Sequence, residues 1–136
     1  MILDCTCFRV RRLSRQISQL YDEALRPTGL RVTQFSLLSA LKNDGPMTVA
    51  ALAQGLGADT TSISRAVAAV EAHGWVLIEP GPDKRSKSVS ISDLGLEVLR
   101  TADPYWRKAQ QHIADVLGLD GQLDLDAKLD ELFHRL

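Results

Sequence analysis

"MTVAALAQGLGADTTSISRAVAAVEAHGWV", residues 47–76, contains two short helical patterns that are separated by a tight turn. Thr48 is a suitable N-cap for the first pattern, VAALAQGL, which ends at Gly57. Asp59 or a neighbouring hydroxyl begins the second pattern, TTSISRAVAAVEAH, which ends at Gly74. The apolar stripe of this second pattern consists of Ile63, Ala66, Val67 and Val70. Two short helices joined by a turn that contains glycine are typical of a helix-turn-helix.

A β-hairpin is predicted immediately after these helices, in WVLIEPGPDKRSKSVSIS, residues 75–92. Trp75–Ile78 is strand-like, and Ser88–Ile91 alternates polar with apolar residues. Pro80–Asp83 supplies turn residues between them. The cations at the tip are Lys84, Arg85 and Lys87. The sequence therefore predicts a winged helix-turn-helix core over residues 30–92, in a mainly α fold with a small β-hairpin.

Further helices are predicted on both sides of this core. Thr6–Leu25 has apolar residues at three- and four-residue steps, and the breakers in RPTGL end it. Thr33 is the expected N-cap of another helix, Gln34–Lys42. Ser92 opens a long helical stretch in which we expect a kink or a local break at Pro104, because the ring removes a backbone donor.

The terminal segments, residues 1–28 and 93–136, are expected to serve dimerisation within a single domain, 1–136. Gly118 and Gly121 are expected to interrupt the chain before a last short helix with leucines at 125, 129, 132 and 136. One small domain cannot easily bury the apolar stripes at both ends. A two-fold dimer would bury them and set two recognition helices about one DNA turn apart. The alternative is that these helices fold back on their own subunit.

The composition suits one domain in the cytoplasm. The 136 residues have a formal net charge of -1 and lack any apolar run long enough to cross a membrane. Cations follow the short apolar start, which is the wrong order for a secretory signal. Within the first 31 residues, six arginines face three acids, so a near-neutral total hides a local basic surface.

Catalysis, metal binding and a cofactor are not indicated. His73, His112 and His134 are scattered, and no nucleophile–base pair has a recognisable spacing. There is no glycine-rich phosphate loop. Two cysteines, without a second cysteine or histidine cluster, suit neither a disulfide framework nor zinc. We therefore expect no enzyme.

Double-stranded DNA is the partner that the pattern favours. The second helix of the pair offers an exposed polar face of Thr60, Thr61, Ser62, Ser64 and Arg65. Hydroxyls bond phosphates or base edges, and arginine reads guanine. Taken alone, these residues are also consistent with a polar helix start, and the hairpin cations with a solvated turn. The remaining rival is a winged-helix module that binds protein without sequence-specific DNA binding.

GLRVTQFSLLSAL, the helix pair and PDKRSKSVSISDLGLEVL together resemble the MarR family of bacterial winged-helix regulators, over nearly the whole chain. The resemblance implies that residues 60–65 form the recognition helix, that Arg85 enters the minor groove, and that Asp83 holds Arg85 in place. It also implies a homodimer with interlocking terminal helices that represses from a pseudo-palindromic operator. Small aromatic effectors bind such proteins in a cleft; Tyr105, Trp106 and His112 are candidates for lining it, or for packing.

Cys7 is a candidate redox site because it falls in the first turn of the first helix, and helix N-termini stabilise anions such as a thiolate. Arg11 lies one turn on and would stabilise a thiolate further. CF and the later LYDEAL resemble the peroxide-sensing branch of the family, which implies Cys7 and Tyr21 as partners; Arg11 replaces its second tyrosine. A bond from Cys5 to Cys7 would need local unwinding, so a bond between subunits is preferred. The alternative is that Cys7 is a buried apolar group at the dimer interface.

Overall fold

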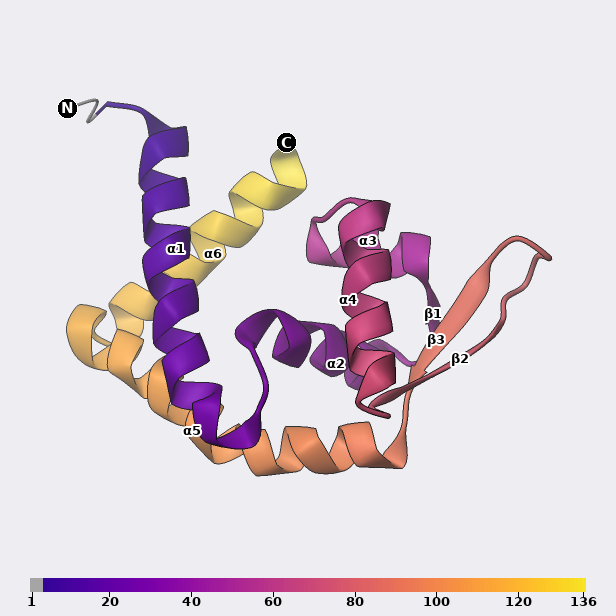
Figure 1. Cartoon of the computed structure of the whole chain (residues 1–136). Coiled ribbons are helices and arrows are strands. Elements are labelled where there is room, and N and C mark those ends of the chain that lie inside the picture. The colour runs from indigo at the N-terminus through magenta and orange to yellow at the C-terminus, as the bar shows by residue number, and fades with distance from the viewer. Residues whose placement is uncertain (1–3) are drawn as a thin grey trace.

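The computed structural model describes residues 4–136, so the first three residues of the predicted 1–28 segment lie outside the described residues. The chain forms a mainly helical fold with one small sheet (Figure 1). In chain order the elements are α1 Thr6–Leu25, η1 Arg26–Thr28, α2 Val32–Asp44, β1 Met47–Thr48, α3 Val49–Leu56, α4 Thr60–Ala72, β2 Val76–Pro80, β3 Lys87–Ile91, α5 Asp93–Leu117 and α6 Leu119–Arg135.

Local capping interactions define the helix-turn-helix, α3 and α4. The Thr48 hydroxyl accepts a hydrogen bond of 3.1 Å from the Ala51 N–H at the start of α3. Gly57 ends α3 with a left-handed φ of 66°, which glycine adopts without steric cost. The Asp59 carboxylate accepts a bond of 2.6 Å from the Ser62 N–H at the start of α4. The helix pair and its predicted caps are confirmed.

The sheet is antiparallel with the strand order β1-β3-β2. The predicted hairpin is confirmed as β2 and β3, which pair from Val76 opposite Ile91 to Pro80 opposite Lys87. The short strand β1 was not predicted, and it pairs Met47 with Val89. Two residues are too few to show an alternating pattern, so only the partner strand reveals β1.

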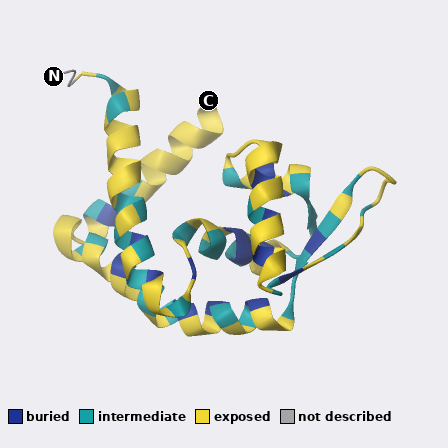
Figure 2. Ribbon diagram, viewed as in Figure 1, coloured by how far each residue is buried: buried dark blue, intermediate teal, exposed yellow. Residues whose placement is uncertain are grey.

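The hydrophobic core lies where α2, α3, α4, the sheet and the first half of α5 meet, as the dark blue segments of Figure 2 show. Its fully buried side chains include Leu37, Leu38, Leu41, Leu52, Val70 and Val89. Phe35 of α2 stacks on Trp106 of α5 with ring centroids 5.6 Å apart. Because α4 and the hairpin both contribute side chains to this core, their positions relative to each other are fixed.

The predicted N-cap of α2 is wrong, because Arg31 rather than Thr33 occupies that position. The Val32 N–H donates 2.7 Å to the carboxylate of Asp22 in α1, and the Arg31 N–H donates 3.0 Å to the Gln34 side chain. The Asp22 carboxylate of α1 thus accepts the hydrogen bond of a backbone N–H that has no partner within the first turn of α2. Local sequence does not reveal such a contact.

The local break expected at Pro104 and the interruption expected at Gly121 are wrong. α5 remains helical through Pro104, and its axis changes direction along its length (Figure 1), in keeping with the other expectation, a kink. Packing of Trp106 and of buried Ala102 and Ala109 outweighs the one backbone hydrogen bond that Pro104 removes. Gly121 lies inside α6, so the final helix of 17 residues is longer than expected. Gly118, with φ of 77°, is the joint between the two helices.

Candidate nucleic-acid interface

The outward face of α4 is polar, as predicted. Its exposed residues include Thr60, Thr61, Ser62, Ser64 and Arg65. The opposite face, with Ile63, Val67 and Val70, is buried in the core. Because hydrophobic burial fixes the rotation of α4, the hydroxyls and the guanidinium point away from the protein.

Asp59 and Ser62 form a pair at the start of this face. Besides the backbone contact, the Ser62 hydroxyl donates 3.0 Å to the second carboxylate oxygen of Asp59. The backbone N–H of Ser62, followed by its hydroxyl, lowers the pKa of Asp59 below its usual value. The ionised carboxylate is well placed at a helix N-terminus. Sequence reasoning identified Asp59 as a cap but not this use of the Ser62 hydroxyl.

The hairpin tip holds its cations outside the protein. Asp83, Lys84, Arg85 and Lys87 are all exposed. Asp83 accepts a hydrogen bond of 2.7 Å from the backbone N–H of Arg85. This bond fixes the loop backbone and does not involve the guanidinium group of Arg85. Four ion pairs occur between residues 4 and 136, and they include none of these cations nor Arg65. These charges are thus available to an external anion.

Gly81 is required for this loop. Its N–H donates 3.0 Å to the Ser86 carbonyl, and a Cβ at Gly81 would lie 2.3 Å from the Ser86 hydroxyl oxygen. The Ser86 hydroxyl itself donates 3.1 Å to the Asp83 carbonyl. The sequence indicated turn chemistry here, but the close approach of the two strand ends is a finding of the structure.

Ser92 joins the helix-turn-helix, the hairpin and α5. Its hydroxyl donates 2.6 Å to the carbonyl of Gly74, which follows α4, and accepts 3.1 Å from the Gly95 N–H in α5. Its backbone N–H donates 2.9 Å to the Trp75 carbonyl. The sequence predicted the cap of α5 correctly, but not the contact with the end of α4.

The redox candidates lie along α1 and do not form one site within a subunit. Cys5 is the N-cap, with extended backbone, and its sulfur accepts a contact of 3.4 Å from the Phe8 N–H. Cys5 therefore lies before the first helical residue, so the helical spacing by which we argued against a bond from Cys5 to Cys7 does not apply to it. Cys7 is exposed in the single chain, and so is Arg11 one turn on.

Tyr21 is separated from Cys7 by about 21 Å along α1, from the rise of 1.5 Å per residue. It is buried, and its hydroxyl donates to the side-chain oxygen of Gln110 in α5. Burial raises the pKa of Tyr21, and the Asp126 carboxylate of α6 raises it further. Within one subunit, Tyr21 therefore stabilises the crossing of α1 with α5.

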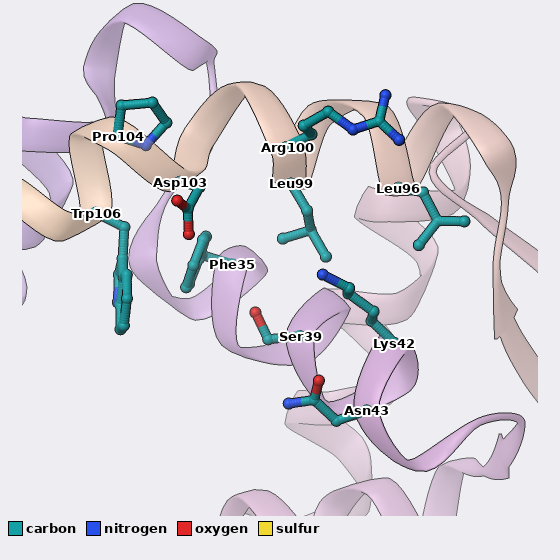
Figure 3. A pocket seen from close by; sticks show the side chains of 10 residues that line it. All are labelled: Phe35, Ser39, Lys42, Asn43, Leu96, Leu99, Arg100, Asp103, Pro104 and Trp106. Atoms are coloured by element: carbon teal, nitrogen blue, oxygen red, sulfur yellow. The ribbon is translucent and has the colours of Figure 1, made fainter.

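A hollow of about 630 Å³ lies between α2 and α5 (Figure 3). Phe35, Leu99 and Trp106 supply apolar walls, and Lys42 extends its ammonium group toward α5. Of the three residues proposed for a cleft, only Trp106 lines this hollow. Tyr105 packs against the core, whereas His112 lines a second hollow of about 630 Å³ between α1, α5 and α6.

A helix-turn-helix followed by a hairpin with a cationic tip defines a winged helix-turn-helix protein. Residues 28–86 match the profile of the MarR family. The structure superposes on the Mycobacterium tuberculosis transcriptional regulator MosR in complex with DNA with a TM-score of 0.87 and 30% identity, covering 97% of this chain and 96% of MosR. The chain belongs to the MarR family.

Other relatives agree with this assignment. YwoH, an HTH-type transcriptional regulator of Bacillus subtilis, is 32% identical over 84 residues, which cover 62% of this chain and 61% of YwoH. An HTH-type transcriptional regulator of Mycobacterium leprae is 36% identical over 103 residues, covering 75% of this chain and 66% of the relative. The chain thus spans less than two thirds of these relatives' length. No helix in residues 4–136 is long and apolar enough to span a membrane.

Proposed function

We propose that the protein is a dimeric, DNA-binding transcriptional regulator that acts as a repressor at a pseudo-palindromic operator. The observation that carries this proposal is the outward polar face of α4 beside the unpaired cations of the hairpin tip. DNA binding of the relative MosR, as its structure with DNA records, supports the same role.

Each element has a distinct role in this proposal. The α4 face, Thr60 to Arg65, enters the major groove, where hydroxyls contact base edges or phosphates and Arg65 reads guanine. The hairpin follows the adjacent phosphates, with Arg85 in the minor groove, where narrow A·T-rich DNA concentrates negative potential. Lys84 and Lys87 neutralise phosphates, and Asp83 holds the loop through its contact with the Arg85 backbone.

Residues 30–92 form the DNA-binding core in this proposal, and residues 1–28 and 93–136 form the dimer. Exposed large apolar side chains support this division because, among residues 4–136, all of them except Leu77 lie outside residues 30–92: Val10, Leu13, Leu94, Val116, Leu117, Leu119, Leu123, Leu129, Leu132, Phe133 and Leu136. Exposed large apolar side chains gathered on the terminal helices mark an interaction site. Burying it against a second subunit would space two α4 helices along the DNA.

Release from DNA requires an effector that binds the two states of the dimer with different free energies. A small aromatic acid suits the hollow between α2 and α5, because the rings of Phe35 and Trp106 supply stacking surface and Lys42 supplies a cation. Oxidation of Cys7 is the second route, with Cys5 and Arg11 beside it on the chain. Tyr21 would reach Cys7 only from the second subunit.

Selection of bound sites from random double-stranded DNA tests this function. We expect enrichment of a two-fold symmetric site, with affinity that falls steeply as salt rises. Repeating the selection with benzoate and with an organic hydroperoxide distinguishes the two effector classes. Absence of any enriched site, with a folded protein, would favour the protein-binding module instead.

A further inference from the structure

The C-terminal end of α6 lies against the helix-turn-helix of its own chain. The helix leaves α5 at Gly118 and runs back toward α3, as its yellow end in Figure 1 shows. In its last turn, the ring of Phe133 packs against Gly57, the residue that ends α3. A Cβ at Gly57 would lie 2.8 Å from Cε2 and 3.4 Å from Cζ of this ring. The contact therefore requires a residue without a side chain at position 57.

The Phe133 ring meets the backbone immediately before α4. Only Gly57 and Ala58 separate the end of α3 from Asp59, the N-cap of α4. The Gly57 N–H donates 3.3 Å to the Gln54 carbonyl, and the left-handed φ of 66° at Gly57 turns the chain toward α4. The C-terminal helix thus touches the turn that leads into the helix for which we propose DNA reading.

This turn makes few buried contacts of its own. Residues 57–60 are all exposed, and glycine has more backbone freedom than any other residue. Segments with few buried apolar contacts are the ones that open locally. The Phe133 side chain covers the turn with one side and remains 54% exposed, which leaves surface for the proposed dimer. An apolar ring in this place restricts the backbone that it covers.

We propose that Phe133 is a positioning residue for DNA binding, because its ring holds the turn between α3 and α4 in one arrangement. This inference rests on the proposed function. A segment that must be ordered on binding lowers the affinity, and ordering it beforehand removes that cost. The end of α6 therefore has a role within its own subunit that is separate from its apolar contribution to the proposed dimer.

Binding of the full chain to a duplex that carries the selected site tests the positioning role. Phe133→Ala should weaken binding by about threefold to tenfold, the cost of ordering the turn. Phe133→Leu keeps an apolar side chain over Gly57 and should bind more tightly than Phe133→Ala. Leu132→Ala is the matched control, because Leu132 is a similarly exposed apolar residue that points about 100° away around α6. It should keep wild-type affinity.

Sedimentation and circular dichroism establish that all the variants are folded and share one oligomeric state at the concentrations used for DNA binding. An equal loss in Leu132→Ala would overturn the proposal, because the effect would then belong to the apolar surface of α6 in general. Wild-type affinity in Phe133→Ala would overturn it as well, while leaving the proposed function intact. A folded wild-type chain that binds no duplex would overturn the proposed function.

The contact itself has a spectroscopic signature that does not depend on DNA. An aromatic ring shifts the NMR resonances of the nuclei beside it, so Phe133→Ala should move the amide signal of Gly57. The signal of Gly29 should stay in place, because a Cβ at Gly29, with its similar φ of 77°, would meet nothing within 4 Å. An unmoved Gly57 signal would overturn the contact and the positioning role together.

Discussion

The hydroxyl of Ser92 lies 2.6 Å from the carbonyl oxygen of Gly74, to which it donates a hydrogen bond. Gly74 follows the helix that we propose enters the major groove, and Ser92 begins the helix that leads to the proposed dimer contacts. One side chain therefore joins the end of α4 to the start of α5. The Ser92 N–H, which donates 2.9 Å to the Trp75 carbonyl, adds a second hydrogen bond across the same junction.

Ser92→Ala should lower the free energy of unfolding by about 1–2 kcal/mol, because it removes both a helix cap and a partly buried hydrogen bond. Ser90→Ala, in the preceding strand β3, is the control, since no hydrogen bond of its side chain occurs among the described residues. Urea denaturation of both variants measures the difference. Equal stabilities would show that the Ser92 hydroxyl does not hold the junction.

Gly95→Ala should destabilise the protein by about 1–3 kcal/mol although alanine favours helices. A Cβ at Gly95 would lie 2.2 Å from the Trp75 carbonyl oxygen and 2.7 Å from the Ile91 side chain. Gly55→Ala in α3 is the matched control, because a Cβ there meets nothing within 4 Å. That change should stabilise by about 0.5–1 kcal/mol. Thermal unfolding that ranks the two variants in the reverse order contradicts this packing.

Arg85→Ala should weaken operator binding by about 1–3 kcal/mol, as for a single specific contact. Lys84→Ala should weaken binding to all DNA sequences alike and reduce the salt slope by about 1. Filter binding at several salt concentrations separates the two effects, with Lys108→Ala in α5 as a control outside the interface. Wild-type affinity in Arg85→Ala would show that the wing assignment is wrong.

Lowering the pH should remove the contribution of the ionised Asp59 carboxylate to the free energy of unfolding. Its pKa is lowered in the folded protein by the Ser62 hydrogen bonds, so its stabilising effect is present above the ordinary carboxyl pKa of about 3.9. The effect is lost as pH falls through the lower folded pKa. Asp59→Asn keeps a good N-cap without a titrating group. The stability advantage of the wild type over this variant should therefore shrink below about pH 4, as chemical denaturation at stepped pH would measure; a constant difference would contradict the linkage.

Cys7→Ser should abolish release from operator DNA by an organic hydroperoxide if thiol oxidation is the effector route, since serine forms no sulfenic acid. Gel-shift titration with the peroxide measures release. Unchanged release in the variant removes Cys7 from the mechanism.

Tyr21→Phe is the companion variant for the same titration. We expect the variant to keep the peroxide response. Its free energy of unfolding should fall by about 1 kcal/mol, because it loses the hydrogen bond that the Tyr21 hydroxyl donates to Gln110. A lost response would instead assign Tyr21 to the thiol of the second subunit.

Local signals predicted the winged core well, because its elements depend on nearby residues. Thr48, Asp59 and Ser92 cap the helices that directly follow them, and the hairpin strands carry their own alternation. The predictions were wrong where a residue distant in sequence determines the start or the continuity of a helix. Asp22 of α1 supplies the acceptor for the start of α2, and packing of Trp106 carries α5 through Pro104.

The candidate site was predictable in composition but not in its internal contacts. Exposure of Thr60 and Arg65 follows from the apolar stripe on the other face of α4. The sequence did not predict that Ser62 donates to Asp59, or that Tyr21 contacts Gln110 rather than a cysteine. A side-chain partner 89 residues away depends on how α1 crosses α5, which no local pattern contains.

The continuity of α5 through Pro104 has a mechanical consequence. Twenty-five helical residues make a lever about 37 Å long, from the rise of 1.5 Å per residue. Tilting its far end by about 5° displaces Ser92 by roughly 3 Å, close to the rise of one base pair. In the proposed dimer, a small rearrangement at the terminal helices would therefore shift each proposed recognition helix by about one base-pair step relative to the DNA grooves.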